Sequence, residues 1–175
     1  MPIMKKLTDL LEHLEYQCIQ GTTDKEISGI VSDSRKAGPG SLFFCIKGAV
    51  SDGHTYAKEV AEKGASVPDS RYAMACISAA WFDHPAEKLK TIGITGTKGK
   101  TTTTYLVKSI LENAGHKTGL IGTIETIIGE EHIPSANTTP ESYLVQEYFA
   151  KMVEAGCDSV VMEVSSQGLM LHRTA

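Results

Sequence analysis

Hydrophobic and polar positions along the chain change period several times, which predicts a succession of helices and strands. Apolar residues at helical spacing predict helices at residues 7–14, 55–63, 71–82, 102–113 and 141–154. Apolar or alternating runs bounded by turn residues predict strands at residues 26–31, 41–46, 91–95, 117–126 and 159–164. Strands that alternate with helices are typical of a parallel sheet with helices on its faces, so the predicted fold class is α/β.

A charged linker divides these elements into two groups. His84-Pro85 ends one predicted helix, and the linker that follows leads to the strand at 91–95. We therefore predict a small N-terminal α/β domain at residues 1–90 and a second domain at residues 91–175. One junction is unusual, because a strand that begins at Ala65 is interrupted at once by Pro68. We expect residues to be missing between Val67 and Pro68, since an α/β unit completes its strand before the next helix.

Composition and charge restrict the class of protein. The chain has 175 residues, 41% of them hydrophobic and 22% charged, with a net charge of −4, which is typical of a globular protein. The sequence shows no basic patch and no long apolar run, so we expect neither a nucleic acid partner nor a membrane partner. The four cysteines are irregularly spaced, which disfavours a zinc site or a disulfide framework and favours the reducing cytoplasm.

The most informative segment lies between a predicted strand and a predicted helix. Its sequence is Gly96-Thr97-Lys98-Gly99-Lys100-Thr101-Thr102. The full P-loop pattern would need a further glycine where Ile94 stands, but the half that contacts phosphate is present. Glycine N–H groups and a helix N-terminus bind phosphate oxygens, the Lys100 ammonium adds positive charge, and the Thr101 hydroxyl is placed to bind Mg²⁺. We predict a nucleoside triphosphate site; the alternative is a glycine-rich turn with a surface lysine.

A carboxylate is expected near this loop. Glu163 ends the apolar strand at 159–164, and ligands of open α/β sheets collect at the carboxyl ends of the strands. A carboxylate at that edge can bind Mg²⁺ directly or through water. The alternative is an ordinary surface glutamate at a strand end.

Several segments together resemble one family. The loop at 96–102 is similar to the ATP loop of the Mur ligases and folylpolyglutamate synthases. Three further regions resemble Mur ligases of the MurE type more specifically. The first is Asn137-Thr138-Thr139-Pro140, and the second is the segment 162–169 with His172-Arg173. The third is Asp33-Ser34-Arg35 with the loop at 47–54. These motifs lie in family order along essentially the whole chain.

The resemblance implies an ATP-dependent acid–amino-acid ligase of peptidoglycan precursor synthesis. Such an enzyme phosphorylates the D-glutamate carboxylate of UDP-MurNAc-L-Ala-D-Glu to an acyl phosphate, which the amine of L-lysine or meso-diaminopimelate attacks. The domain at 1–90 would bind the UDP sugar, and the domain at 91–175 would be the first part of a P-loop ATPase domain with a parallel sheet.

The resemblance also implies a role for individual residues. ATP would be bound by Gly96, Thr97, Lys98, Gly99, Lys100, Thr101 and Thr102. Lys100 and Glu163 would be catalytic, and Mg²⁺ would be bound by Thr101 and Glu163. The muramoyl part of the substrate would contact Asn137, Thr138, Thr139, Ser165 and Arg173. Its uridine end would contact Ser32, Ser34, Ala49, Val50 and Ser51. Simpler roles are open for some of these residues: Ser32 and Ser34 could be turn residues, and Thr138 and Thr139 could cap a helix ahead of Pro140.

Two other hypotheses compete with a MurE-type ligase. One is a ligase similar to folylpolyglutamate synthase, which the UDP-domain motifs disfavour. The other is a non-catalytic module that binds a nucleotide or a UDP sugar. The family's C-terminal domain, which receives the incoming amino acid, has no counterpart before Ala175. We therefore expect this chain to be an N-terminal fragment with an incomplete sheet that does not catalyse ligation alone.

Overall fold

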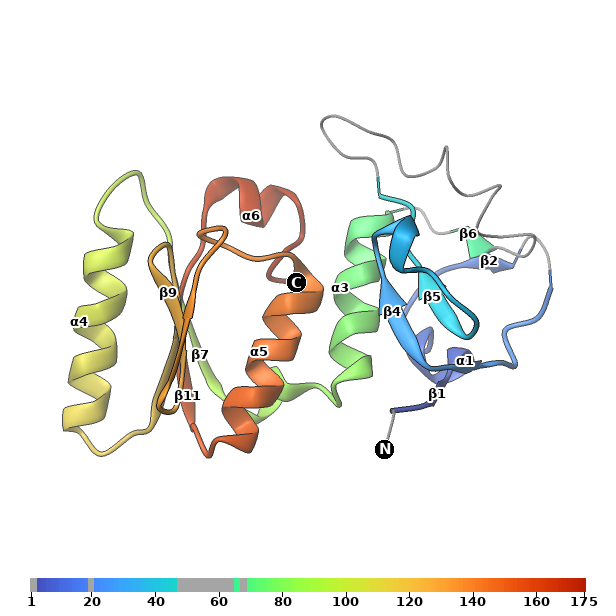
Figure 1. The fold of residues 1–175 in the computed structure, drawn as a ribbon. Coiled ribbons are helices and arrows are strands. Elements are labelled where there is room, and N and C mark those ends of the chain that lie inside the picture. Colours follow the sequence, from blue (N-terminus) through green and yellow to red (C-terminus); the bar gives the residue numbers. More distant parts are fainter. Residues whose placement is uncertain (1–2, 19–20, 47–64, 67–68) are drawn as a thin grey trace. The chain divides into compact units, whose positions relative to one another are not determined.

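A computed structural model describes residues 3–18, 21–46, 65–66 and 69–175 (Figure 1). The chain forms two compact units, Met1–Trp81 and Phe82–Ala175. Residues 82–90 pack with the second unit, because Pro85 is buried there and Leu89 belongs to its hydrophobic core. The assignment of one domain to a UDP sugar and of the other to ATP stays a prediction.

The described part of the first unit contains short paired strands and helices. β1 (Lys5–Lys6) pairs antiparallel with β3 (Glu26–Ile27), β2 (Gln17–Cys18) pairs antiparallel with β6 (Ala65–Ser66), and β4 (Gly29–Val31) pairs parallel with β5 (Ser41–Phe43). The helices are α1 (Leu7–Leu10), the 3₁₀ turn η1 (Ser34–Lys36) and α3 (Ser70–Trp81). The α3 helix begins where the Asp69 carboxylate accepts hydrogen bonds from two backbone N–H groups, those of Arg71 at 2.8 Å and Tyr72 at 3.1 Å.

Several predicted elements of this unit are shorter in the structure. The first helix ends at Leu10 instead of Leu14, and the strand predicted at 41–46 ends at Phe43. The strand predicted at 26–31 is divided at Ser28, because Glu26–Ile27 pairs with β1 whereas Gly29–Val31 pairs with β5. The helix predicted at 55–63 and the junction of Val67 with Pro68 lie outside the described residues.

The second unit is a mixed sheet between helices. Its strands have the order β10-β9-β8-β11-β7, and their bounds are β7 (Lys90–Ile94), β8 (Thr118–Ile121), β9 (Glu125–Ile128), β10 (Glu131–Pro134) and β11 (Ser159–Glu163). The helices are η3 (Pro85–Lys88), α4 (Lys100–Asn113), α5 (Ser142–Glu154) and α6 (Ser166–Met170). Figure 1 shows α4 and α5 on opposite faces of this sheet.

The parallel sheet that the sequence predicts is found in three of these strands. β8 and β7 both pair parallel with β11, which lies between them. The single strand predicted at 117–126 is wrong, because the chain turns back after Ile121 and forms the antiparallel hairpin of β8 with β9. The N–H of Gly122 donates to the Glu125 carbonyl at 3.0 Å and closes this turn. The sheet therefore continues beyond β8 with two antiparallel strands.

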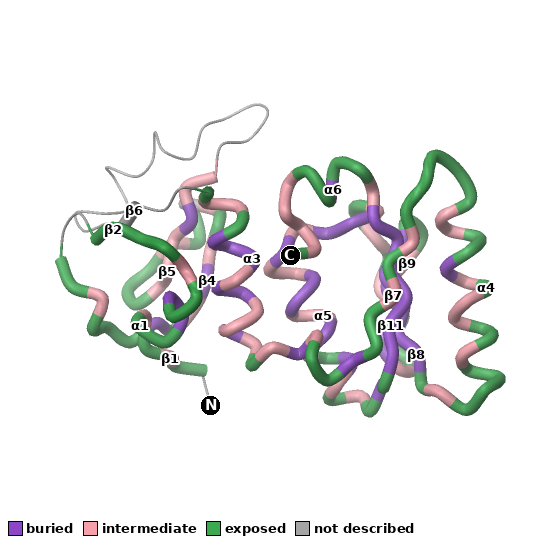
Figure 2. Tube along the Cα trace, turned by 180° about the vertical axis from the view of Figure 1, so that it is seen from behind, coloured by how far each residue is buried: buried purple, intermediate pink, exposed green. Residues whose placement is uncertain are grey.

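The main core lies between the sheet and α5. Alternate residues of β11, Val160 and Met162, pack there with Val145, Phe149 and Met152 of α5. Figure 2 shows β8 and β11 buried along their length, whereas much of α4 is exposed. The other alternate residues of β11, Val161 and Glu163, therefore lie on the α4 face, and Glu163 contacts α4 directly. In the described part of the chain, no helix has both the length and the hydrophobicity that crossing a membrane requires.

The core contact of Gly119 with Met152 gives a stability prediction. A Cβ at Gly119 would overlap the sulfur of Met152, whose side chain is fully buried. We expect Gly119→Ala to lower the free energy of unfolding by about 1–3 kcal/mol, because overpacking strains a close-packed core. Urea unfolding followed by circular dichroism measures this change. Gly38→Ala is the control, since a Cβ at that position meets no atom within 4 Å; equal stability of both variants would contradict the prediction.

Candidate nucleotide and substrate site

The predicted phosphate loop joins the end of β7 to the start of α4. Gly96 and Gly99 have φ angles of 144° and 81°, which residues with a Cβ adopt at a cost. Gly99 is also the N-cap of α4 and makes no capping hydrogen bond from a side chain to the first N–H groups of the helix. These N–H groups are therefore available to an anion. The Lys100 ammonium lies over the loop and donates to the carbonyl of Gly96 at 2.9 Å.

Glu163 lies beside this loop and is 1% exposed. Its Oε2 accepts a hydrogen bond from the Thr101 hydroxyl at 3.0 Å, and its Oε1 accepts one from the backbone N–H of Thr123 at 2.8 Å. The Thr123 hydroxyl lies 3.2 Å from the same Oε2. These donors offset part of the free energy that burial of a carboxylate costs. The alternative that Glu163 is an ordinary surface residue is therefore wrong.

The pair formed by Thr101 and Glu163 fits a magnesium ion. Both side chains present oxygen atoms, the ligand type that Mg²⁺ prefers, and Thr101 Oγ1 lies 3.0 Å from Glu163 Oε2, so one cation could contact both. Among the described residues, no group of three or more His, Cys, Asp or Glu side chains gathers as a metal site. Mg²⁺ does not need such a group, because it often binds through one or two carboxylates together with water and substrate phosphates.

The Asn137-Pro140 segment is held against the end of β11. The buried Thr139 hydroxyl donates to the Glu163 carbonyl at 3.0 Å and accepts from the N–H of Ser165 at 3.0 Å. The Thr138 hydroxyl lies 3.0 Å from that of Thr123. Neither threonine caps α5, whose N-cap is Glu141 without a capping hydrogen bond from a side chain. The alternative that they cap a helix is therefore wrong, and Asn137 is exposed beside them.

Ser165 and Arg173 are brought to the same segment. The Ser165 hydroxyl caps α6 by accepting from the N–H of Gly168 at 3.0 Å. The Arg173 guanidinium donates to the Thr139 carbonyl at 3.0 Å and to the Glu141 carboxylate at 2.6 Å. These contacts gather the predicted muramoyl contacts in one region. They also bring Glu141 into this region. Sequence reasoning missed Glu141, because its position directly after Pro140 is the only feature of the sequence that could have indicated it.

The predicted uridine contacts belong to the first unit. Ser32 is exposed after β4, and Ser34 begins η1. Asp33, between them, accepts two hydrogen bonds from the Arg35 side chain, at 2.9 and 2.7 Å, and these lower the pKa of the Asp33 carboxyl to about 2. Arg35 therefore orders this turn around an ionised Asp33. Ala49, Val50 and Ser51 lie outside the described residues.

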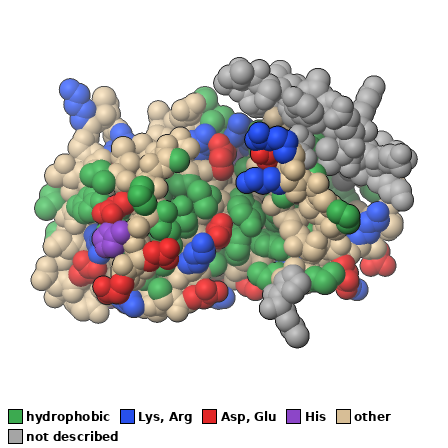
Figure 3. Space-filling view, in the orientation of Figure 1, with side chains coloured by type: hydrophobic (Ala, Val, Ile, Leu, Met, Phe, Trp, Pro, Cys, Tyr) green, Lys and Arg blue, Asp and Glu red, His purple; other side chains and the backbone are tan. Residues whose placement is uncertain are grey.

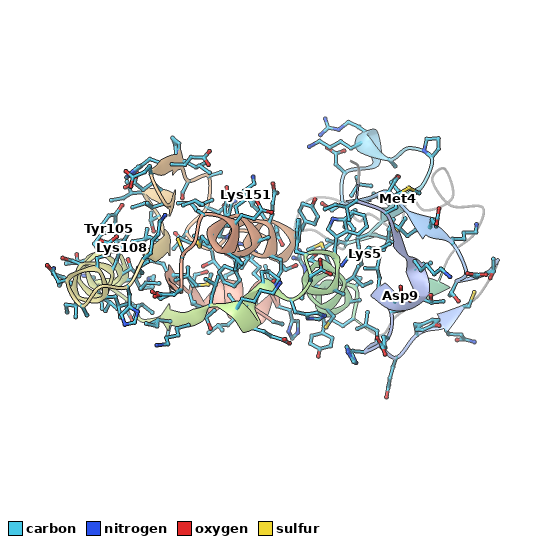
Figure 4. All side chains as sticks on the ribbon, turned by 90° about the horizontal axis from the view of Figure 1, so that it is seen from below. Met4, Lys5, Asp9, Tyr105, Lys108 and Lys151 are labelled. Atoms are coloured by element: carbon cyan, nitrogen blue, oxygen red, sulfur yellow. The ribbon has the colours of Figure 1, made fainter. Side chains whose placement is uncertain are left out.

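A second polar cluster ties α4 to the hairpin. Tyr105 lies on α4, one turn after Thr101 (Figure 4). Its hydroxyl donates to Glu125 at 2.8 Å, and His132 Nδ1 lies 2.8 Å from the other oxygen of Glu125. Burial and the Glu125 carboxylate together raise the pKa of Tyr105 to about 12. The hydrogen bond from His132 is the main cause that lowers the pKa of Glu125. Sequence reasoning missed this cluster, since its members are spread over separate elements.

Comparison with known protein families shows to which family the chain belongs. A model described as "Mur ligase family, catalytic domain" matches residues 26–100, and one described as "Mur ligase middle domain" matches residues 94–175. The chain belongs to the Mur ligase family. The predicted family is thereby confirmed, and the second match contains the phosphate loop from Gly96 together with Glu163.

Curated Mur ligases share extensive identity with the chain. The UDP-N-acetylmuramoyl-L-alanyl-D-glutamate–2,6-diaminopimelate ligase 1 of Clostridium acetobutylicum is 45% identical over 186 aligned positions, which cover 96% of this chain and 39% of that protein. The enzyme of that name from Bacillus licheniformis is 44% identical, with 96% of this chain and 38% of that protein covered. The chain thus spans less than two fifths of these relatives. An alignment of 186 positions exceeds the 175 residues of the chain, so these relatives carry additional residues within the matched region.

Solved structures confirm the Mur ligase fold. A UDP-N-acetylmuramoyl-L-alanyl-D-glutamate–2,6-diaminopimelate ligase matches with a TM-score of 0.78 at 19% identity, over 98% of this chain and 38% of that one. MurF from Acinetobacter baumannii matches with a TM-score of 0.56 at 23% identity, over 95% of this chain and 37% of that one. At these identities the matches support the α/β fold alone.

Proposed function

We propose that this chain supplies the nucleotide site and the UDP-sugar contacts of a ligase that extends UDP-MurNAc-L-Ala-D-Glu by one diamino acid. One observation carries the proposal: Glu163 joins the two predicted binding regions. Its carboxylate accepts from Thr101 of the phosphate loop, and its carbonyl accepts from Thr139 of the Asn137-Pro140 segment. A phosphate donor and a carboxylate acceptor bound at these two segments would lie next to each other.

The proposed chemistry depends mainly on position and charge. ATP bound at residues 96–102 would phosphorylate the D-glutamate carboxylate, and an amine would then displace phosphate to form the amide. Lys100 would neutralise charge on the transferred phosphoryl group, as lysines of phosphate loops do. Thr101 and Glu163 would hold Mg²⁺, which reduces charge on the phosphates when it is bound.

The substrate contacts keep their predicted roles in this proposal. The muramoyl portion would contact Asn137, Thr138, Thr139, Ser165 and Arg173, and the uridine end would contact Ser32, Ser34, Ala49, Val50 and Ser51. Residues 1–90 would form the UDP-sugar domain, and residues 91–175 would form part of the ATP domain. We propose the cytoplasm as the location, because the reaction uses ATP.

The relatives favour one incoming amino acid. The sequence leaves L-lysine and meso-diaminopimelate as alternatives, whereas the relatives named above are 2,6-diaminopimelate ligases. We therefore propose diaminopimelate as the amino acid that the whole enzyme adds.

Calorimetry of this chain tests the proposal. Mg-ATP and UDP-MurNAc-L-Ala-D-Glu are titrated separately, and we expect saturable binding of each ligand with one site per chain. UDP-glucose, which lacks the muramoyl peptide, is the matched control and should bind more weakly than UDP-MurNAc-L-Ala-D-Glu. A folded chain that binds neither the nucleotide nor the UDP-muramoyl dipeptide would overturn the proposed function.

A further inference from the structure

The turn between β8 and β9 places Thr123 directly against Glu163. Thr123 and Ile124 form the tip of this turn, which the hydrogen bond from Gly122 to Glu125 closes. The N–H of Thr123 donates to Glu163 Oε1 at 2.8 Å. A Cβ at position 122 would lie 2.8 Å from that same oxygen, so a residue with a side chain there would push the carboxylate away. Gly122 therefore permits the close approach that fixes Thr123 beside Glu163.

The Thr123 hydroxyl lies between two acceptors that belong to different segments. It is 3.2 Å from Glu163 Oε2 and 3.0 Å from the hydroxyl of Thr138. A hydroxyl carries one hydrogen, so it donates to only one of these oxygens at a time. Oε2 also accepts from Thr101 at 3.0 Å, so Thr123 shares this oxygen with the phosphate loop.

The surroundings hold this hydroxyl in place. The hydrogen bond from Tyr105 to Glu125 fixes the start of β9 against α4, and the N–H of Ser135 donates to the Ile124 carbonyl at 3.1 Å. The turn is therefore attached both to the helix that follows the phosphate loop and to the strand that leads to Asn137. A change at the phosphate loop or at the Asn137-Pro140 segment can therefore alter the hydrogen bond that the Thr123 hydroxyl makes.

We infer that Thr123 is a positioning residue that couples nucleotide binding to binding of the UDP-muramoyl substrate; the inference rests on the proposed function. Thr101 and Glu163 would hold a cation that binds with the nucleotide, and Glu163 Oε2 would then be a weaker acceptor for the Thr123 hydroxyl. The Thr123 hydroxyl would donate to Thr138 instead and order the Asn137-Pro140 segment for the substrate. Coupling of this kind is reciprocal, so the substrate also strengthens nucleotide binding.

Thr123→Val tests the coupling, because valine has the shape of threonine and keeps the backbone N–H that binds Glu163. The affinity of this chain for UDP-MurNAc-L-Ala-D-Glu is measured by calorimetry with and without the Mg²⁺ complex of a non-hydrolysable ATP analogue. In the unmodified chain we expect the nucleotide to raise this affinity by about 5-fold or more, the lower end of typical allosteric coupling. In Thr123→Val the ratio of the affinity with the nucleotide to the affinity without it should fall to about 1. Thr123→Ser should restore this ratio, since serine keeps the hydroxyl.

Further variants separate coupling from a general loss of structure. Thr91→Val removes an exposed hydroxyl near the opposite end of β7 from the phosphate loop and should leave the ratio unchanged. Thr138→Val should also reduce the ratio to about 1, and adding Thr123→Val should reduce it no further. Thr138→Val carries the test if circular dichroism shows that Thr123→Val does not fold.

The outcomes distinguish this inference from the proposed function. If both ligands bind but the ratio is about 1 in the unmodified chain, or is unchanged in Thr123→Val, the coupling role is wrong and the proposed function stands. If the unmodified chain binds neither ligand, the proposed function fails and the coupling role fails with it.

Discussion

Lys100→Ala should weaken binding of Mg-ATP to this chain by roughly 10- to 150-fold. Hydrogen bonds to charged groups contribute about 1.5–3 kcal/mol, and each 1.4 kcal/mol corresponds to a factor of ten in affinity. The Lys100 ammonium already lies over the loop, where it donates to the Gly96 carbonyl at 2.9 Å. Because an ammonium carries three donors, it can keep this contact while it binds phosphate oxygens. Calorimetry with Mg-ATP measures the loss.

The fold should tolerate this substitution, because the loop is exposed and Lys100 lies at its boundary with α4. Lys88→Ala removes the same charge from an exposed position in η3 and should change the affinity by less than about 2-fold, as expected for a distant surface charge. If Lys100→Ala is folded and binds Mg-ATP as tightly as the unmodified chain, the phosphate loop has been assigned wrongly.

The strongly patterned elements of the second unit could be predicted from the sequence. The apolar run Val160-Val161-Met162 of β11 predicts a buried strand, and the structure buries these residues together with Ser159 and Glu163. The helices α4 and α5 could be predicted from apolar spacing and from the glycines that follow them. The positive φ angles of Gly115 and Gly156 agree with that reasoning.

The hairpin could not be predicted from local pattern. The apolar residues Leu120, Ile121 and Ile124 favour one continuous strand at 117–126, whereas the turn after Ile121 contacts a carboxylate from elsewhere in the chain. The N–H of Thr123 donates to Glu163, which is 40 residues away in the sequence. Hydrophobic periodicity depends on residues that are close together in the sequence, so it cannot indicate a contact between distant parts of the chain. The antiparallel part of the sheet was missed for this reason.

The candidate site could be predicted only in part for a related reason. Lys100, Thr101 and Glu163 follow from the positions of a loop and a strand end, and the structure brings Thr101 and Glu163 within 3.0 Å. Thr123, Glu125 and Tyr105 follow from contacts between elements, so their places became visible in the structure. Figure 3 shows both acidic and basic side chains on the face that it presents, so side-chain charge on that face does not by itself mark the site.

Glu163→Gln should remove most of the effect of Mg²⁺ on nucleotide binding. We expect the affinity for ATP in the presence of Mg²⁺ to fall by about 10- to 100-fold, the range seen when a partner of a bound metal is lost. The affinity without Mg²⁺ should not fall, since glutamine keeps the shape and removes a negative charge that repels the phosphates. The amide oxygen can still accept from the Thr123 N–H, and the amide nitrogen can donate to the hydroxyls of Thr101 and Thr123. Calorimetry with ATP, with and without MgCl₂, measures both affinities.

The matched variant is Glu154→Gln, which makes the same change at an exposed position at the end of α5. It should retain the full effect of Mg²⁺ on ATP binding, because a surface carboxylate outside the site does not contact the cation. Thermal unfolding of Glu163→Gln should show one cooperative transition, since each hydrogen bond to the carboxylate has a counterpart in the amide. If folded Glu163→Gln responds to Mg²⁺ as strongly as the unmodified chain, the cation binds elsewhere, and the buried carboxylate serves to hold Thr101 and Thr123 in place.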